Sequence, residues 1–194
     1  MAASITHFIT EKSASIGLVG LIRVEIEGWI FALIGWIPGM AGFIVRYISF
    51  RCLAKSIKGF CWIQSRVTIV HTSRLSVGRF FGVNSGTYIN AIGGISIGDY
   101  VLIGSNVTIS SGRHPIEDSD PPIFARETIP LPITIEDDVW IGAGAVIMPG
   151  ITLRKGTVVG ANSVVTKDTA EYAVVVGAPA RHIRNRLRPK DEVL

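Results

Sequence analysis

A six-residue period is the feature that most constrains what this chain can fold into. From residue 133 to residue 168 the sequence reads ITIEDD VWIGAG AVIMPG ITLRKG TVVGAN SVVTKD. Each unit has an aliphatic residue at the same place and an apolar or small residue two places before it. Two earlier blocks show the same spacing. The aliphatic positions are Val77, Val83, Ile89, Ile97, Ile103, Ile109, Ile135, Ile141, Ile147, Leu153, Val159 and Val165.

Six residues fit a short strand followed by a tight turn. Such a strand points two side chains toward one face, and a tight corner favours Gly, Asn or Asp. Three units would form one triangular coil of about 18 residues, and stacked coils would align the aliphatic positions as an interior ladder. The separate strands of a β-sandwich would not hold one phase over six units. The sequence therefore predicts an all-β parallel solenoid, of about five coils, over residues 63–109 and 133–168.

Composition excludes several other classes of protein. Hydrophobic residues make up 48% of the 194 residues and charged residues 18%, whereas disordered chains combine low hydrophobicity with high charge. The two cysteines, Cys52 and Cys61, cannot build a disulfide framework and lack zinc-binding spacing. We therefore expect a cytoplasmic, reducing environment and no metal. Residues 1–15 are polar and mixed, unlike a signal peptide.

The net charge of +4 is unevenly distributed, with +3 on residues 1–60, −2 on residues 61–180 and +3 on residues 181–194. A nucleic-acid-binding body would carry a basic stripe, so no nucleic-acid partner is expected. Basic ends fit anionic lipid or phosphate. We divide the chain into an N-terminal apolar segment (1–60), a β-solenoid domain (61–180) with a protruding loop (111–132), and a short basic C-terminal tail (181–194).

The N-terminal segment contains an uncharged apolar run, GWIFALIGWIPGMAGFIV, from Gly28 to Val45. Pro38 and Gly39 interrupt this run, so each half is too short to cross a bilayer. Residues 22–27 alternate like a strand, but we expect a helical segment. Three interpretations remain open: a helical hairpin attached to a membrane surface through residues 15–60, a cap packed on the core or another subunit, and a true span. The basic residues that follow favour the inner face of the plasma membrane for the first.

Residues 111–132, SGRHPIEDSDPPIFARETIPLP, interrupt the period and contain five prolines. A loop of this length in a compact repeat protein is usually functional. Its histidine, His114, is by position alone a solvated surface residue, but an imidazole can accept a proton at neutral pH. Cys52 and Cys61 lie far from the loop in sequence, which argues against a covalent cysteine intermediate.

The period and the motifs SGRHPI, VVTKD and VVGAPARH resemble those of the hexapeptide-repeat acyltransferases, over residues 63–188. The chain is most similar to the galactoside and maltose O-acetyltransferases and to sugar O-acetyltransferases of bacterial surface-polysaccharide gene clusters, whose N-terminal segment its own resembles. The resemblance implies a left-handed parallel β-helix, a homotrimer with active sites between neighbouring prisms, and acetyl-CoA as co-substrate. It also implies that His114 is the general base that activates an acceptor hydroxyl.

The same resemblance suggests further site residues. Trp140 would line the pantetheine channel, and backbone amides near Gly142 would stabilise the oxyanion. Lysine and arginine after the motifs VVT and VVGAPA would bind phosphates; without the resemblance they are solvated tail residues. Asn90, in TYINAIGG, resembles an acceptor-binding asparagine, although two residues are missing from the spacing that follows, and Asn84 is the alternative. The predicted coenzyme-binding residues are Trp140, Gly142, Ala143, Ala161, Thr166, Lys167, Arg181 and Arg184.

The expected function is acetyl-CoA-dependent O-acetylation of a sugar hydroxyl, on a free or lipid-linked saccharide, in the synthesis of O-antigen, capsule or exopolysaccharide. The alternative is an acetyltransferase for a small soluble acceptor such as serine, an antibiotic or a free sugar. A zinc hydratase of this fold needs three converging histidines, whereas His7, His71, His114 and His182 lie far apart in the sequence. A non-catalytic scaffold would not bind acetyl-CoA.

Overall fold

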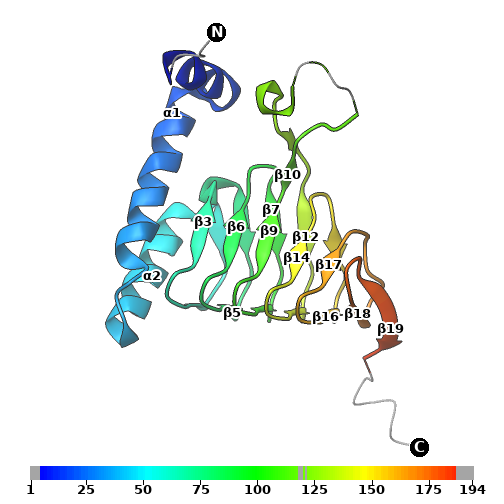
Figure 1. Ribbon diagram of the computed structural model, residues 1–194. Coiled ribbons are helices and arrows are strands. Elements are labelled where there is room, and N and C mark those ends of the chain that lie inside the picture. Colours follow the sequence, from blue (N-terminus) through cyan, green and yellow to red (C-terminus); the bar gives the residue numbers. More distant parts are fainter. Residues whose placement is uncertain (1–4, 118–119, 121, 187–194) are drawn as a thin grey trace, which may run out of the picture.

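The computed structural model describes residues 5–117, 120 and 122–186, with side chains from residue 17 onward. Its main body is a three-sided parallel β-solenoid, and two α-helices close the N-terminal end of this solenoid (Figure 1). Each full coil contributes one short strand to each of three sheets, which we call faces A, B and C in the order in which the chain visits them.

The strands of the three faces pair in parallel from coil to coil. Face A consists of β1 (Ser56–Ile57), β4 (Leu75–Val77), β7 (Ile95–Ile97), β12 (Ile133–Ile135) and β15 (Thr152–Leu153). Face B consists of β2 (Cys61–Ile63), β5 (Phe81–Val83), β8 (Leu102–Ile103), β13 (Trp140–Ile141), β16 (Val158–Val159), β18 (Ala173–Val176) and the antiparallel β19 (Arg181–Asn185). Face C consists of β3 (Thr68–Val70), β6 (Tyr88–Asn90), β9 (Thr108–Ser110), β14 (Val146–Ile147) and β17 (Val164–Val165).

The aliphatic positions predicted from the period form the interior ladder. All of them are at most 3% exposed. On face B, for example, Ile103 lies in register between Val83 of the coil before and Ile141 of the coil after. The predicted solenoid is therefore confirmed. It has about six turns rather than five, because it begins at β1, before residue 63, and continues to β18, after residue 168.

The coils that carry additional residues have them at one corner only, and the last coil is shorter, since Val158 pairs with Val174, 16 residues further on. Ser56 pairs with Ser76 and Ser76 with Ser96, a spacing of 20 residues, whereas Thr134 and Thr152 are 18 residues apart. The extra residues lie at the C–A corner, where the chain leaves face C for face A: η1 (Thr72–Arg74) in the first coil and residues 91–94 in the second. Residues 111–132 are inserted at this corner of the third coil, so every insertion in the solenoid is accommodated at the same edge.

The N-terminal segment forms two helices, α1 (Ile5–Ile34), which is kinked at Gly17, and α2 (Gly39–Leu53). Both pack on the first coil, α1 against β3 and α2 against β2, and on each other. Phe31 and Phe50 complete the hydrophobic core. The expected helical segment is confirmed, and the strand-like alternation of residues 22–27 lies inside α1. Within the described residues, no helix is long and apolar enough to cross a bilayer.

Two buried charged side chains fix these helices in place. Glu27 is fully buried and accepts hydrogen bonds from the amide and the hydroxyl of Thr72, at 3.1 and 2.6 Å, and from Arg23 Nε at 3.0 Å. Arg46 is also buried and donates hydrogen bonds of 3.3 Å to the carbonyl of Ile34, the last residue of α1, and of 2.8 Å to the carbonyl of Ile37 in the turn that follows. It also donates one of 3.0 Å to the carbonyl of Ile63, so it ties the turn between the two helices to the first coil.

Both predicted domain boundaries differ from the structure. β1 belongs to face A although it lies within the segment assigned to residues 1–60, and residues 181–185 form β19 rather than the start of a tail. The rest of the predicted tail, residues 187–194, lies outside the described residues, as do loop residues 118, 119 and 121 and the side chain of His7.

Candidate active site

The loop that carries His114 projects from the C–A edge of the prism (Figure 1). Its base is an antiparallel ribbon of β10 (Gly112–Arg113) and β11 (Ile129–Pro130), and η2 (Ile123–Ala125) lies in its outer part. The amide of Leu131 donates a hydrogen bond of 2.8 Å to the carbonyl of Ser111, which closes the loop and returns the chain to face A.

Ser111 ties the base of the loop to the preceding coil, a role that the sequence analysis missed. Its buried hydroxyl donates to the carbonyl of Asn90 at 3.0 Å and accepts from the amide of Gly93 at 2.8 Å. Arg126 Nη1 also donates to the carbonyl of Pro115, at 3.3 Å, across the loop. The only available signal for Ser111 was a small polar residue at the point where the period stops.

His114 is exposed and directly follows β10. Within the described residues, no side chain forms a hydrogen bond with its ring. The neighbouring carboxylate, Glu117, pairs instead with Arg113 at 3.0 Å and accepts a hydrogen bond from the amide of Ile116 at 2.9 Å. Backbone hydrogen bonds, together with Arg113, lower the pKa of Glu117. Glu117 is therefore an anion held by Arg113 rather than the group that orients His114.

Asn90 shares the C–A corner with His114. It ends β6 and pairs in register with Ser110, directly before the loop. Its Oδ1 accepts a hydrogen bond from the amide of Ile92 at 3.1 Å, and its Nδ2 makes no hydrogen bond within the described part of the chain. That amide group can therefore donate to an acceptor oxygen. Asn84 follows β5 at the opposite edge of the prism, the B–C corner.

Gly142, Ala143 and Ala161 meet at the B–C corner of two consecutive coils. The amide of Asn162 donates to the carbonyl of Ala143 at 2.8 Å, and a Cβ on Gly142 would lie 2.6 Å from the nitrogen of Ala161, so this close stacking requires glycine. The amide of Gly142 donates to the carbonyl of Val159 at 2.8 Å and is not available to an oxyanion. Ala143 and Ala161 are exposed, and no hydrogen bond of the described residues uses their amides.

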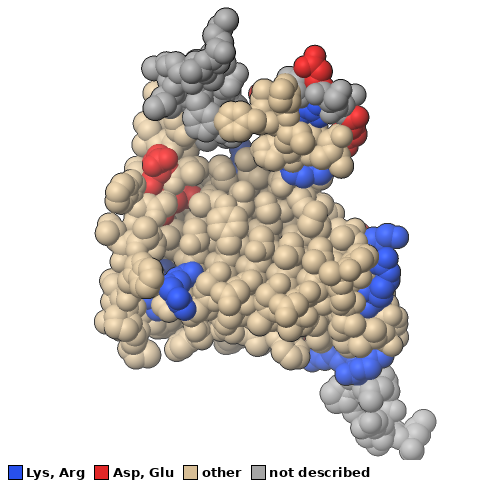
Figure 2. Space-filling model, viewed as in Figure 1, with Lys and Arg blue, Asp and Glu red and all other residues tan. Residues whose placement is uncertain are grey.

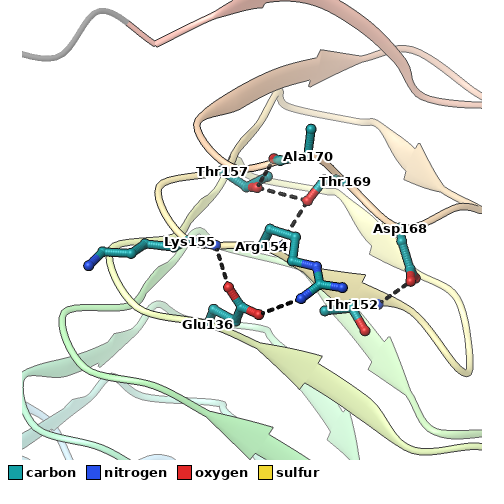
Figure 3. A network of polar contacts seen from close by, with 8 residues as sticks. All are labelled: Glu136, Thr152, Arg154, Lys155, Thr157, Asp168, Thr169 and Ala170. Atoms are coloured by element: carbon teal, nitrogen blue, oxygen red, sulfur yellow. Dashed lines mark hydrogen bonds and ion pairs between the residues drawn. The ribbon is translucent and has the colours of Figure 1, made fainter.

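The motif VVTKD divides into structural and free residues. Asp168 accepts a hydrogen bond from the amide of Thr152 at 2.8 Å, and the hydroxyl of Thr169 accepts one from the amide of Arg154 at 2.9 Å (Figure 3). Glu136 extends this network, because its carboxylate contacts the Arg154 side chain at 3.2 Å. These contacts hold neighbouring coils together, so Asp168, the last residue of the motif, has a structural role, as does Thr169, which follows the motif.

Thr166 and Lys167 follow β17 at the C–A corner and are exposed. They lie two coils beyond the level of Ser110, on the same edge of the prism as His114. Arg181 and Arg184 are exposed on β19, at the edge of face B. Figure 2 shows basic side chains gathered around this C-terminal end of the solenoid. An exposed cluster of this kind suits a phosphate group.

Trp140 points outward from face B, as its place beside the inward Ile141 predicts, and it is 52% exposed. In register it lies between Leu102 and Val158. With the exposed Trp62 these residues form an apolar column on the outside of face B. The corresponding column on face A is polar and consists of Ser56, Ser76, Ser96, Thr134 and Thr152.

The predicted site residues thus occupy three places. Those at the C–A corner are Asn90, His114, Thr166 and Lys167; those at the B–C corner are Gly142, Ala143 and Ala161; those on face B are Trp140, Arg181 and Arg184. Face C separates the two corners within one chain.

The cysteines are not at the site. Cys61 is buried in the first coil, and burial raises the pKa of its thiol to about 11, so it stays protonated at neutral pH. Cys52 lies on α2. Among the described side chains, no group of three His, Cys, Asp or Glu residues is arranged to hold a metal ion.

The chain is similar in sequence to known acetyltransferases. The family described as "Hexapeptide repeat of succinyl-transferase" matches residues 79–111 and 132–167. A galactoside O-acetyltransferase of Escherichia coli is 39% identical over 63% of this chain and 60% of its own length. A chloramphenicol acetyltransferase of Agrobacterium fabrum is 56% identical over 27% of this chain and 25% of its own length. The chain spans about half the length of the curated relatives it matches.

Two solved structures share the fold over most of their length. A maltose O-acetyltransferase of Clostridium difficile is 29% identical, with a TM-score of 0.79 over 88% of this chain and 90% of that one. A hexapeptide-repeat acetyltransferase of Vibrio cholerae, in complex with acetyl coenzyme A, is 30% identical, with a TM-score of 0.76 over 84% of this chain and 87% of that one. The predicted left-handed parallel β-helix is confirmed by this likeness and by the strand pairing.

Proposed function

Because this chain belongs to the hexapeptide-repeat acetyltransferases, we propose that it transfers the acetyl group of acetyl-CoA to a sugar hydroxyl, with His114 as the general base. One observation carries the proposal. The solenoid is interrupted by a long loop at one corner only, and this loop carries an exposed imidazole four residues after Ser110, the partner of Asn90 in the sheet, on the edge that also carries Thr166 and Lys167.

The chemistry that this arrangement supports is direct transfer. The imidazole of His114 takes the proton of the acceptor hydroxyl while the hydroxyl oxygen forms a bond to the acetyl carbonyl carbon. The carbon–sulfur bond then breaks, and the proton passes from His114 to the departing sulfur. The products are the acetyl ester and the free thiol of coenzyme A. The donors that would face the developing oxyanion are the amides of Ala143 or Ala161, since the amide of Gly142 is occupied.

The residues present fit acetyl-CoA. The stacked Ala143 and Ala161 leave room beside the coils for a thin pantetheine chain. Lys167, Arg181 and Arg184 are exposed cations of the kind that bind phosphates. Acetyl-CoA supplies an activated thioester, and the protein supplies its position and the base.

A sugar acceptor is supported by the maltose and galactoside enzymes to which the chain is similar. The similarity to a chloramphenicol acetyltransferase supports a second candidate, an antibiotic hydroxyl, over a shorter stretch of the chain. Within the sugar class we propose a saccharide of bacterial surface-polysaccharide synthesis, free or lipid-linked, because the N-terminal apolar segment resembles that of enzymes in this group.

We also propose a homotrimer whose sites lie between prisms. Face B exposes the apolar column of Trp62, Leu102 and Trp140, which favours burial against another protein surface. Face C separates the B–C group from the C–A group within one chain, so a neighbouring copy could bring the two kinds of residue together at one site.

The test is an assay of thiol release from acetyl-CoA with maltose, a galactoside and chloramphenicol as acceptors. His114→Ala should reduce turnover at least about 100-fold, because it removes the general base, and His114→Asn should behave alike. The size of the assembly and its circular dichroism should not change, since the His114 side chain is exposed in the single chain and is not part of its core. Turnover close to that of the unaltered protein would refute the assignment of His114. Transfer to chloramphenicol alone would replace the sugar acceptor with the antibiotic.

A further inference from the structure

The two N-terminal helices bury charged side chains beside the core residues Phe31 and Phe50, and they expose large apolar side chains. Their buried side includes two charged side chains, Glu27 at 0% and Arg46 at 4% exposed. Both are held by hydrogen bonds to the first coil or to the turn after α1. The opposite side carries large apolar side chains. A surface helix in water normally places apolar residues inward and charges outward, so solvent alone does not explain this arrangement.

The exposed apolar residues follow the helical period. In α1 and the turn after it they are three or four residues apart, and in α2 they are four apart, so each set forms a continuous stripe. Both helices pack on the first coil and on each other, so the two stripes face away from the solenoid. We call this surface the outer helical face; it consists of Val19, Ile22, Ile26, Trp29, Leu33, Trp36, Met40, Ile44 and Ile48.

The outer helical face is large and strongly exposed. Trp29 is 66% and Trp36 is 74% exposed, and contiguous apolar patches beyond a few hundred Å² usually mark an interaction site. In Figure 2 most of the described surface over α1 is uncharged. Tryptophan combines an apolar ring with an N–H donor and is enriched where hydrocarbon meets water. The exposed Trp29 on α1 and Trp36 in the turn after it therefore favour a lipid interface.

The charges around this face favour an anionic surface. Among the described side chains from residue 17 to residue 66, the exposed basic residues are Arg23, Arg51, Lys55, Lys58 and Arg66, and the exposed acidic residue is Glu25. Arg23 is partly neutralised by Glu27 and Lys58 lies near Asp99, whereas Arg51, Lys55 and Arg66 have no acidic neighbour in the sequence. Each Lys or Arg near an anionic leaflet adds to binding.

We propose that the outer helical face docks on an anionic phospholipid bilayer, with α1 and α2 lying in the headgroup region rather than across the membrane. Within the part of the chain that the structure describes, neither helix is both long and apolar enough to span a bilayer. The hydrogen bonds of Glu27 and Arg46 hold them on the solenoid, so they need not unfold from the core to reach lipid. This contact does not depend on acetyl transfer.

Docking has a consequence that rests on the proposed function. Trp29 also lines a shallow groove between α1 and β3, together with Val24, Gly28 and Val70. Val70 pairs in register with Asn90, which pairs with Ser110. Strands in a sheet are about 4.8 Å apart, so the column from the groove to the acceptor asparagine and the base of the His114 loop is short. A saccharide on a lipid carrier could enter from this side.

The docking test uses the full-length protein and flotation with lipid vesicles, without acetyl-CoA. Vesicles of phosphatidylcholine with about 30% phosphatidylglycerol should bind the protein, and pure phosphatidylcholine should bind it several-fold less. About 0.5 M salt should weaken the binding without abolishing it, because the apolar contact is not screened. The double variant Trp29→Ser with Trp36→Ser should bind at least about tenfold less.

A matched pair of single variants provides the control. Ile26→Ser removes an exposed isoleucine from the outer helical face, and Ile183→Ser removes an equally exposed one from β19 at the other end of the molecule. Only Ile26→Ser should reduce flotation. Circular dichroism should be unchanged in all variants, since the replaced side chains are exposed.

Three results would overturn the proposal. One is a protein that stays in the aqueous phase with both kinds of vesicle. Another is undiminished flotation of the tryptophan double variant. The third is a double variant whose assembly is smaller than that of the unaltered protein in light scattering without lipid, because the outer helical face would then be an interface between copies. None of these results bears on the assay of His114, which uses acceptors in solution.

Discussion

The solenoid and the helical cap, which consists of α1 and α2, differ in the side chains that they bury and expose. In the solenoid, aliphatic residues such as Ile103 and Ile141 are fully buried, and polar residues occupy the outside of face A. In the cap, the charged Glu27 and Arg46 are buried beside Phe31 and Phe50, and isoleucine and tryptophan are exposed. Hydrophobic burial therefore accounts for the first region, whereas the second combines hydrophobic burial with specific hydrogen bonds of buried charges.

The difference shows what each region can tolerate. A ladder of aliphatic residues is stabilised by contacts between close-packed side chains, and a lost methyl group leaves a cavity. A buried carboxylate is stabilised only while its donors remain in place. The outer helical face, by contrast, contributes little to the fold of one chain, so changes there should affect binding and spare stability.

The largest effect should come from the ladder. Ile103→Ala should lower the free energy of unfolding by about 4 kcal/mol, because it opens a cavity between two coils. Ile44→Ala, on the exposed stripe of α2, should change it by less than about 0.5 kcal/mol. Chemical denaturation at a fixed protein concentration measures both. Equal losses of unfolding free energy for the two variants would contradict the conclusion that the apolar stripe of α2 is exposed and contributes little to the fold.

A smaller effect is expected at the contact between cap and solenoid. Glu27→Leu should cost about 2 kcal/mol of unfolding free energy, because the amide of Thr72 loses its buried acceptor, whereas the hydroxyl of Thr72 keeps the carbonyl of Leu53. Glu27→Gln keeps the shape and one oxygen, so it should cost about half as much. Limited proteolysis should rank the variants in the same order, with α1 cleaved faster in Glu27→Leu than in Glu27→Gln. If Glu27→Leu were neutral, the carboxylate would not fix the helix.

The smallest effect should come from the exposed A–B corner of the solenoid. Asp99 accepts hydrogen bonds from Arg79, from its side-chain Nε at 2.9 Å and its amide at 2.7 Å, and these hydrogen bonds lower the pKa of Asp99. A carboxyl whose pKa is lowered by folding stabilises the protein above its unfolded pKa, and this contribution is lost as the pH falls through the folded pKa. Asp99→Asn should therefore flatten the acid limb of a plot of Tm against pH.

Replacing the partner provides the control for this corner. Arg79→Gln removes the side-chain donors of Asp99 and should also reduce the acid dependence of Tm, while the double variant should add little to either single change. An acid limb that is unchanged in Asp99→Asn would exclude the pair as a source of pH dependence. High salt should weaken the effect, because both side chains are at the surface.

Much of the solenoid could be predicted from the sequence because its contacts repeat. The position of Ile141 relative to Ile103 follows from the period alone, and so does the outward direction of Trp140. The motif SGRHPI marked the loop, and its position at a corner followed from where the period stops. The two additional residues at the C–A corner of each of the first two coils were not predicted, because irregular turns such as η1 leave no periodic signal.

The sequence could predict which residues belong to the candidate site, but not which of their groups are already used in hydrogen bonds. Nothing in DDVWIGAGA indicates that the amide of Gly142 is already used by the carbonyl of Val159. Likewise, nothing in VVTKD separates the structural Asp168 from the exposed Lys167. Hydrogen-bond partners from other coils decide both points, and these partners are about 18 residues away in the chain.

The sequence by itself determined the coil, its interior ladder and the corner that carries His114, because a period of six repeats the same local choice in every coil. Only the tertiary structure decided which side of α1 and α2 faces the core. An apolar helix with few charges has no preferred face of its own; Thr72 and the carbonyl groups around Arg46 supply the partners that draw Glu27 and Arg46 inward. The same contacts leave the apolar side of both helices exposed.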